Sequence, residues 1–226
     1  KTLCALPQEL YLIEKDKRFI DNLKNYTPHE NIFNQDVLNS NLFDFPIDPN
    51  LKDKSWWFIS NLPYNASVPI TLKFMREECI KYMTLMYQKE VAEKICIDLM
   101  PDSKITKSMN SLHALCCTFF NVQKLCHVSP KCFSPPPKVE SCVLSFERRK
   151  DPQIDLIHWS SFESFLRKLF SQRRKQIGSI LKGFYSEEIV TRILANENID
   201  YKIRSERLTL KQVQILYFRF KEEINK

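Results

Sequence analysis

The tetrapeptide at 61–64, Asn-Leu-Pro-Tyr, places a hydrogen-bond acceptor, a rigid turn and an aromatic ring directly after the apolar run 56–60. The side-chain oxygen of Asn61 and the carbonyl of Leu62 are two acceptors that can take both N–H groups of an adenine amine. Pro63 restricts the backbone of Leu62 and has no N–H of its own. Tyr64 offers a flat face for stacking a base. The order of residues suits attack by such an amine on a positively charged sulfonium electrophile. A tight turn with a packed tyrosine explains the same four residues about equally well.

Two acidic residues follow two other short apolar segments. Glu14 ends the segment 10–14, and Asp36 ends the segment 31–36. In open α/β sheets, ligands bind beyond the carboxyl ends of the strands, where one carboxylate accepts from both ribose hydroxyls. A second carboxylate, one strand further on, can accept from an adenine amino group. Each acid alone is as readily a helix cap or a solvated side chain.

The elements that must position these residues alternate between strand and helix over the first two-thirds of the chain. Apolar runs predict strands at 10–14, 31–36, 56–60, 82–88, 126–128 and, after a Pro-rich loop, from Val139 to Ser145. Helical spacing is found at 16–26, with Asp16 as its cap, at 70–80 and 89–99, and at 111–122, where the helix alternatively runs into a strand. This alternation predicts an α/β, doubly wound sheet for a domain over residues 1–150.

Beyond Asp151 the pattern changes to helical periodicity. We expect helices over 159–172, 173–184, 186–198 and 209–224. We therefore expect residues 151–226 to form a small all-helical C-terminal domain.

Basic residues gather at the start of this second domain, with no acid between Glu163 and Glu187. The cluster consists of Arg167, Lys168, Arg173, Arg174, Lys175 and Lys182, and Arg148, Arg149 and Lys150 at the boundary extend it. Such residues can follow the phosphates of a nucleic acid, although a basic helix is more often only a solvated face. The net charge of +7 agrees with a polyanionic partner but does not name one.

Composition narrows the class of protein further. No apolar run is long enough to cross a bilayer and the start shows no signal-peptide pattern, so we expect a cytoplasmic protein or one of an organelle matrix. The eight cysteines contain no Cys-x-x-Cys pair, and we expect reduced thiols. A zinc site is the less favoured alternative, and its candidate ligands are His113, Cys116, Cys126, His127 and Cys132.

Four segments together resemble one family, the S-adenosylmethionine-dependent ribosomal-RNA adenine dimethyltransferases. They are 61-NLPYNAS-67, 88-QKEVAEKI-95, 130-PKCFSPPPKVESCVL-144 and 171-SQRRKQIGSIL-181. The tetrapeptide alone is shared by many amino-methyltransferases, whereas the Pro-rich segment and the QRRK segment resemble the small-subunit rRNA branch. The resemblance implies a Rossmann-like methyltransferase sheet, S-adenosyl-L-methionine as cofactor, and a partly assembled small ribosomal subunit as partner of a monomeric enzyme.

Carried over position by position, the resemblance also implies roles for individual residues. Glu14, with Lys15 beside it, would bind the cofactor ribose, and Asp36, flanked by Gln35 and Val37, the cofactor adenine. Asn61 and the Leu62 carbonyl would hold the target amine next to the cofactor. Tyr64 and Phe133 would sandwich the target base, which must leave its stack to reach them.

One departure from the family pattern concerns glycine. The family begins with a strand and a Gly-rich loop around the methionine part of the cofactor, but this chain has only Gly178 and Gly183, both late. We therefore expect that the loop and a central strand are missing and that the chain binds cofactor weakly. The alternatives are an rRNA-binding assembly factor without catalysis, a large-subunit rRNA methyltransferase of the resistance type, and a mitochondrial relative with a transcription role. A DNA adenine methyltransferase fits the Pro-rich and basic segments less well.

Overall fold

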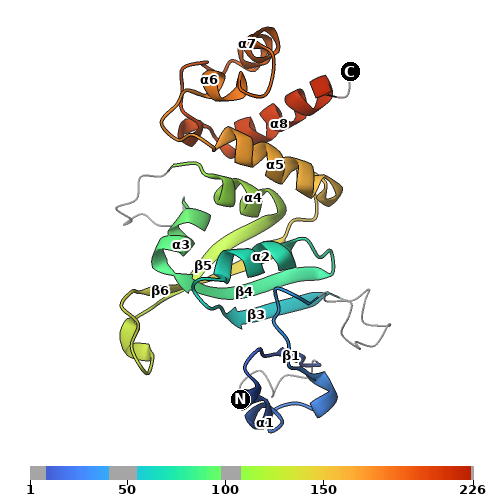
Figure 1. Ribbon diagram of the computed structural model, residues 1–226, viewed down its shortest axis with the longest axis vertical. Helices are drawn as coiled ribbons and strands as arrows, with labels where there is room; N and C mark the ends of the chain where they lie inside the picture. The colour runs from blue at the N-terminus through green and yellow to red at the C-terminus, as the bar shows by residue number, and fades with distance from the viewer. Residues whose placement is uncertain (1–8, 41–54, 98–107, 225–226) are drawn as a thin grey trace.

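The computed structural model of the chain describes residues 9–40, 55–97 and 108–224 (Figure 1). Three parts follow one another along the long axis of the molecule. A small N-terminal lobe lies at one end, a four-stranded sheet with helices lies in the middle, and a helical part lies at the other end.

The N-terminal lobe carries the two acidic candidates on short elements. Its elements are β1 (Leu12–Ile13), η2 (Lys17–Phe19), α1 (Ile20–Leu23), η3 (His29–Asn31) and β2 (Ile32–Phe33). The two strands are parallel, with Leu12 opposite Ile32. They are shorter than predicted, and among the described residues they pair only with each other. The cap at Asp16 is confirmed, because its side chain accepts a hydrogen bond from the N–H of Arg18 at the start of η2.

The main sheet confirms the α/β class but is mixed rather than wholly parallel. It contains β3 (Trp56–Asn61), β4 (Ile80–Gln88), β5 (Phe120–Val128) and β6 (Ser141–Arg148) in the order β3-β4-β6-β5. The pair β3–β4 is parallel, whereas β6 runs antiparallel to both β4 and β5. The carboxyl ends of β3 and β4 and the start of β6 therefore meet at one edge of the sheet.

Helices cover one face of this sheet: α2 (Ser67–Met75), α3 (Lys89–Ile95) and α4 (Ser111–Phe119). On this face Phe58 stacks on Phe74, and Met83 and Leu85 are fully buried. Segment 111–122 is a helix that runs into a strand, and β5 begins at Phe120, earlier than the predicted 126–128.

The opposite face of the sheet leaves large side chains accessible. Trp57 and Tyr82, paired across β3 and β4, are 56% and 47% exposed. They line a shallow hollow of about 380 Å³ together with polar side chains of β5 and β6.

The helical part comprises η7 (Leu156–His158), α5 (Trp159–Leu169), α6 (Ile177–Leu181), α7 (Glu187–Asn196), η8 (Ser205–Arg207) and α8 (Leu210–Ile224). The helices predicted over 159–172, 186–198 and 209–224 are confirmed. The helix predicted over 173–184 is wrong, because residues 173–175 form a turn and only 177–181 are helical. The N–H groups of Ile177 and Gly178 donate instead to the carbonyls of Ile203 and Tyr201.

The hydrophobic core continues from the sheet into the helical part. Phe119 of α4 packs against Trp159 and Phe162 of α5. The buried amide of Gln214 on α8 donates to Thr118 of α4 at 3.0 Å. The domain boundary near Asp151 stays a prediction. No helix within the described residues is long and apolar enough to span a membrane.

Candidate active site

The Asn-Leu-Pro-Tyr turn lies at the carboxyl end of β3, where the sheet ends and α2 begins. Asn61 is the last residue of the strand and is exposed, whereas Leu62 is buried in the core at 3% exposure. The N–H of Ala66 donates to the Pro63 carbonyl at 3.0 Å and closes the turn. The buried Leu62 side chain thus anchors the backbone whose carbonyl is the second candidate acceptor, while the Asn61 amide lies at the surface.

The Pro-rich segment reaches the same edge of the sheet through β6. The hydroxyl of Tyr64 lies 2.9 Å from the hydroxyl of Ser141, the first residue of β6. Two segments about 77 positions apart in the chain therefore meet at this hydrogen bond. Phe133 is partly exposed at the end of the short turn Pro130–Cys132, on the connection that leads from β5 to β6. Ser141 was not among the predicted site residues, although it belongs to the Lys-Val-Glu-Ser segment that the sequence singled out.

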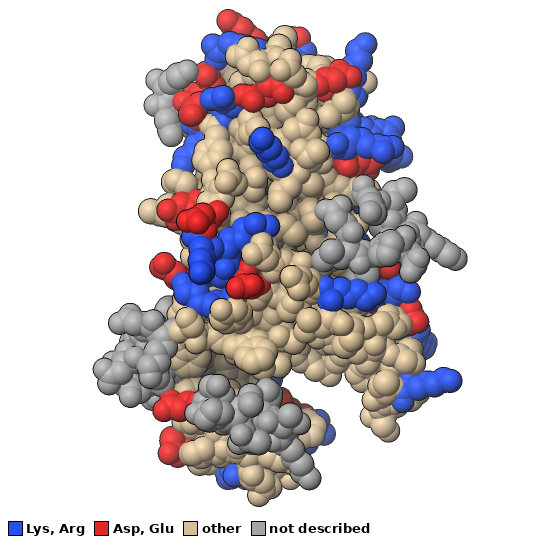
Figure 2. Space-filling model, turned by 180° about the vertical axis from the view of Figure 1, so that it is seen from behind, with Lys and Arg blue, Asp and Glu red and all other residues tan. Residues whose placement is uncertain are grey.

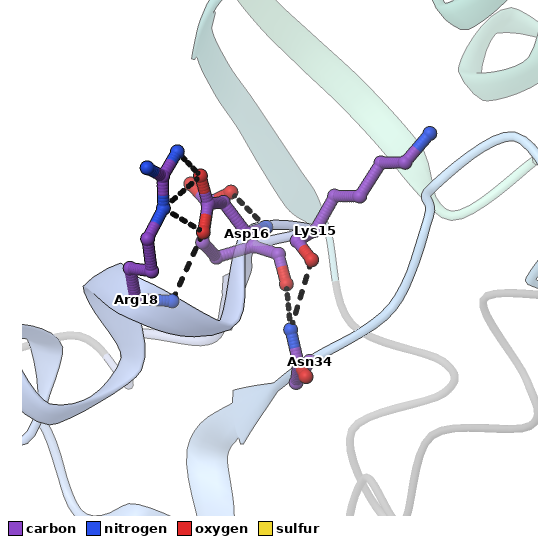
Figure 3. Close-up of polar contacts among 5 residues, drawn as sticks. Lys15, Asp16, Arg18 and Asn34 are labelled. Atoms are coloured by element: carbon purple, nitrogen blue, oxygen red, sulfur yellow. Dashed lines mark hydrogen bonds and ion pairs between the residues drawn. The ribbon is translucent and has the colours of Figure 1, made fainter.

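The acidic candidates lie side by side beyond the ends of β1 and β2. A carboxylate oxygen of Glu14 accepts the N–H of Asp16 at 2.7 Å. The side-chain amide of Asn34 donates to the carbonyls of Glu14 and Lys15. The bond between Asn34 and Lys15 can be followed in Figure 3. These bonds hold the two strand ends together and leave further lone pairs on the Glu14 carboxylate for a ligand.

The carboxylate of Asp36 accepts hydrogen bonds from a cation and from a backbone N–H. Its carboxylate binds the ammonium of Lys15 at 2.8 Å and the N–H of Leu38 at 3.0 Å. The hydrogen bond from Lys15 is the largest of the causes that lower the pKa of Asp36 from its ordinary value. Asp36 is therefore ionised at neutral pH and accepts hydrogen bonds only. Gln35 is exposed beside it, and Val37 is half-buried against the core.

A lysine on α2 links the N-terminal lobe to this helix. The ammonium of Lys73 donates to the carbonyls of Leu38 and Ser40, which follow Asp36. The helix α2 begins at Ser67, shortly after the turn at 61–64, and Lys73 is in its last turn, so this contact places the segment after Asp36 near the far end of the helix. Sequence reasoning missed Lys73, since a single lysine on a helix carries no local signal.

Arg148 is a correction among the predicted RNA-binding residues. Its guanidinium donates to the carbonyls of Ile80, Met75 and Glu77 at 2.7–2.9 Å, and it lies over the ring of Phe120. Burial lowers its pKa from the ordinary value. A guanidinium used in this way stabilises the end of α2 and the start of β4, so we leave it out of any RNA-contacting surface.

The other basic candidates differ in whether their side chains already contact other groups of the protein. Arg149 donates to the Cys117 carbonyl, Arg167 pairs with Glu163, and Lys182 pairs with Glu187. The ammonium of Lys168 lies over the rings of Phe184 and Tyr185. By contrast, the turn residues Arg173, Arg174 and Lys175 are exposed and form no ion pair within the described part of the chain.

Tertiary contact adds three basic residues to this turn. Gln176 forms a β-bridge with Arg204, which brings the segment 201–207 alongside the turn. This segment contributes the exposed Lys202, Arg204 and Arg207. We call these three residues, together with Arg173, Arg174 and Lys175, the basic turn surface. In Figure 2, Lys and Arg side chains recur along one edge of the view, from the helical part down to the tip of the β5–β6 connection.

The candidate zinc ligands do not form a metal site. His113 and Cys116 are buried on α4, and the ring of His113 contacts the Ile95 carbonyl. Cys126 and Cys132 are exposed on and beyond β5. The described residues contain no group of three or more His, Cys, Asp or Glu side chains placed to bind a metal.

Comparison with known proteins agrees with this geometry. Residues 2–221 match the family described as "Ribosomal RNA adenine dimethylase". The "Ribosomal RNA small subunit methyltransferase A" of Malacoplasma penetrans is 34% identical over 208 residues, which cover 92% of this chain and 72% of that protein. The protein of the same name from Clostridium botulinum is 32% identical over 214 residues, 94% of this chain and 76% of that one.

Two solved structures share the fold. A dimethyladenosine transferase from Plasmodium falciparum superposes with a TM-score of 0.77 at 21% identity, over 98% of this chain and 85% of that one. The 23S rRNA methyltransferase ErmE superposes with a TM-score of 0.69 at 21% identity, over 97% and 84% of the two chains. At this level of identity the likeness shows the fold alone. With the family match along nearly its whole length, the chain belongs to the ribosomal RNA adenine dimethylase family.

Proposed function

We propose that this protein dimethylates the exocyclic amines of adjacent adenines in a 3′-terminal loop of small-subunit rRNA, using S-adenosyl-L-methionine. The observation that supports this most directly is the Asn-Leu-Pro-Tyr turn at the carboxyl end of β3, joined through Tyr64 to Ser141 of the Pro-rich segment. The names of the small-subunit relatives favour this substrate over large-subunit rRNA. Modification of a partly assembled small subunit, by a monomer in the cytoplasm, is part of the same proposal.

In this proposal the chain positions the target amine by two acceptors. The Asn61 side-chain oxygen and the Leu62 carbonyl accept the two N–H groups of the adenine amine. This geometry draws the nitrogen lone pair out of the ring and toward the electrophile. The cofactor supplies a methyl group on a positively charged sulfonium. Tyr64 and Phe133 stack on the two faces of the base after it has left its helix.

The residues that follow β1 and β2 fit the nucleoside part of that cofactor. Glu14, with Lys15 beside it, offers carboxylate lone pairs to ribose hydroxyls. Asp36, ionised at neutral pH, accepts from the adenine amino group, with Gln35 and Val37 flanking it. Such an acceptor set suits a nucleoside with hydroxyl and amino donors, which is the chemistry that this cofactor presents.

The basic turn surface is the proposed contact for the phosphate backbone of the rRNA. Its residues are exposed, and they come from two segments that lie side by side. Arg149, Arg167, Lys168 and Lys182 stay within the proposal as further basic residues for the RNA backbone. Binding should weaken with salt, because each neutralised phosphate releases counterions.

Methyl transfer to unmethylated small subunits tests the catalytic proposal. The assay uses labelled S-adenosyl-L-methionine, with this chain and with the chain extended by any residues that its gene encodes upstream of Lys1. Asn61→Ala should abolish transfer, whereas Asn65→Ala, in the same turn, should leave it near the unmodified level. Mass spectrometry of the digested rRNA should identify dimethyladenosine. Transfer that survives Asn61→Ala would contradict the role of this turn.

An rRNA-binding assembly factor without catalysis is the alternative function that the same assay tests. Subunit binding by the extended protein without any methyl transfer would support this candidate and contradict the enzymatic one.

The salt dependence of subunit binding tests the RNA surface. Arg173→Ala with Arg174→Ala removes two charges that form no ion pair with any described residue. Arg192→Ala with Arg219→Ala is a charge-matched control whose residues are paired with Glu223 and Glu197. The first pair should flatten the slope of log affinity against log salt by about 1.5, and the control should leave it unchanged. Equal slopes for the two double variants would rule out this surface.

A further inference from the structure

Ser141 is a fixed point in the sheet at the edge where the catalytic turn lies. It is fully buried, and it is the first residue of β6, which lies between β4 and β5. Its backbone is paired with Gln88 on one side and with Val128 on the other. A side chain held between two neighbouring strands has little freedom to move with a loop.

Tyr64, in contrast to Ser141, lies outside the sheet. It lies in the connection between β3 and α2, and its side chain is only half-buried. Its hydroxyl lies 2.9 Å from the Ser141 hydroxyl, and either group can donate. Because the hydroxyl lies on the axis of the ring, this one bond fixes where the tip of the ring lies. The faces of the ring stay available for stacking.

A second tether holds the backbone of the same tyrosine. The Ser67 hydroxyl donates to the Tyr64 carbonyl at 3.1 Å, and the Thr71 hydroxyl donates to the Ser67 carbonyl at 2.8 Å. Thr71 has only one hydroxyl proton, so the fully buried Tyr87 must donate to Thr71 across their 2.6 Å contact. The turn is therefore tied to α2 and β4 at its backbone and to β6 at its ring.

We propose that Ser141 is a positioning residue for methyl transfer, which fixes the tip of the Tyr64 ring, and with it the direction of the ring's long axis, against the flipped adenine through this hydroxyl–hydroxyl bond. The inference rests on the proposed function, because it concerns the base-stacking step of that reaction. With the ring tip fixed to a buried strand, the stacked base keeps one orientation relative to the acceptors at Asn61 and Leu62. Loss of the bond leaves the aromatic face in place but allows the ring to tilt, and misplacement of a reacting group on this scale lowers the rate of the chemical step.

Steady-state methyl transfer with a double-mutant cycle tests the inference. The variants are Ser141→Ala, Tyr64→Phe and both together, in the form of the protein that is active on small subunits. Ser145→Ala, on the same strand β6, is the matched control. Thermal unfolding is measured for each variant. Tyr64→Phe probes the same bond from the half-buried side, so the test holds even where Ser141→Ala unfolds.

We expect Ser141→Ala and Tyr64→Phe each to lower kcat about tenfold, with KM for the subunit and cofactor affinity unchanged. The double variant should be no slower than either single variant, because both changes remove one bond. Fluorescence of 2-aminopurine at the target position of the rRNA should be less quenched in the single variants than with Ser145→Ala. A merely structural role of Ser141 would change thermal stability without this kcat effect and without coupling to Tyr64.

The outcomes separate the inference from the function on which it rests. Suppose that the unmodified protein methylates adenine normally. If both single variants then have the kcat of the unmodified protein, or if their effects multiply fully in the double variant, only the role of Ser141 is overturned. An unmodified protein that transfers no methyl group overturns the proposed function and with it this inference.

Discussion

The ammonium of Lys15 and the carboxylate of Asp36 lie 2.8 Å apart, beyond the carboxyl ends of the parallel strands β1 and β2. This contact is the largest cause that lowers the pKa of Asp36 from its ordinary value of 3.8. The carboxylate is therefore ionised at any pH above that lowered pKa. Its contribution to folding stability and to ligand acceptance is lost only as the pH falls through it.

Removal of the Lys15 ammonium should raise the pH at which the Asp36 carboxylate becomes protonated. Lys15→Ala should raise the pKa of Asp36 toward 3.8, so that the carboxylate is protonated at a higher pH than in the unmodified protein. NMR titration of the Asp36 carboxyl carbon measures this directly, and cofactor affinity should show the same shift. Lys17→Ala is the control in the neighbouring turn. An unchanged titration curve after Lys15→Ala would contradict the prediction.

Arg148 should matter for stability and not for RNA. Arg148→Ala leaves three backbone carbonyls without their charged donor, and we expect a loss of about 2–4 kcal/mol in the free energy of unfolding. Arg149→Ala, which loses one bond of an exposed side chain, should cost less than about 1 kcal/mol. Denaturant unfolding gives both values. If Arg148→Ala flattens the salt dependence of subunit binding while stability is unchanged, our assignment is wrong.

Gly178 is required where α6 meets the segment 201–207. A Cβ at this position would lie 2.1 Å from the ring of Tyr201, which cannot be accommodated without moving the ring. Gly178→Ala should therefore lower the free energy of unfolding by about 1–3 kcal/mol and weaken subunit binding. Ser179→Ala, at the exposed neighbouring position, is the control.

Truncation of the ring should recover part of this loss. In a Tyr201→Ala background the added methyl group has space, so Gly178→Ala should cost less there than in the unmodified protein. Equal costs in the two backgrounds would mean that the close approach of Gly178 and Tyr201 is not the cause.

The bond between Gln214 and Thr118 should couple the helical part to the sheet domain. Thr118→Val keeps the shape but leaves the buried Gln214 amide without this acceptor, which should cost about 1–3 kcal/mol. Thr118→Val with Gln214→Leu should cost less than the sum of the two single changes, since no polar partner is then left alone. Chemical unfolding of the four proteins measures the coupling. Additive costs would show that the two residues act independently.

Much of the fold follows from local patterns in the chain. Period-two and continuous apolar runs predict β3, β4 and β6, and helical spacing predicts α5, α7 and α8, because one buried face imposes its period on consecutive residues. The resemblance also located the turn at 61–64 and the Pro-rich segment 130–144 without coordinates. These signals are local, so they survive in a single sequence.

Contacts between distant residues decided the rest. The helix expected over 173–184 is cut short because Gln176 and Ile177 pair with residues 203 and 204, a bond that no local window contains. The same pairing brings Lys202, Arg204 and Arg207 to the basic turn surface. From the sequence we expected Arg148 to contact phosphate, but the fold places its guanidinium against three backbone carbonyls. Ser141 could not be identified from the sequence, because its hydroxyl contacts Tyr64 only once the fold has brought β6 beside the turn at 61–64.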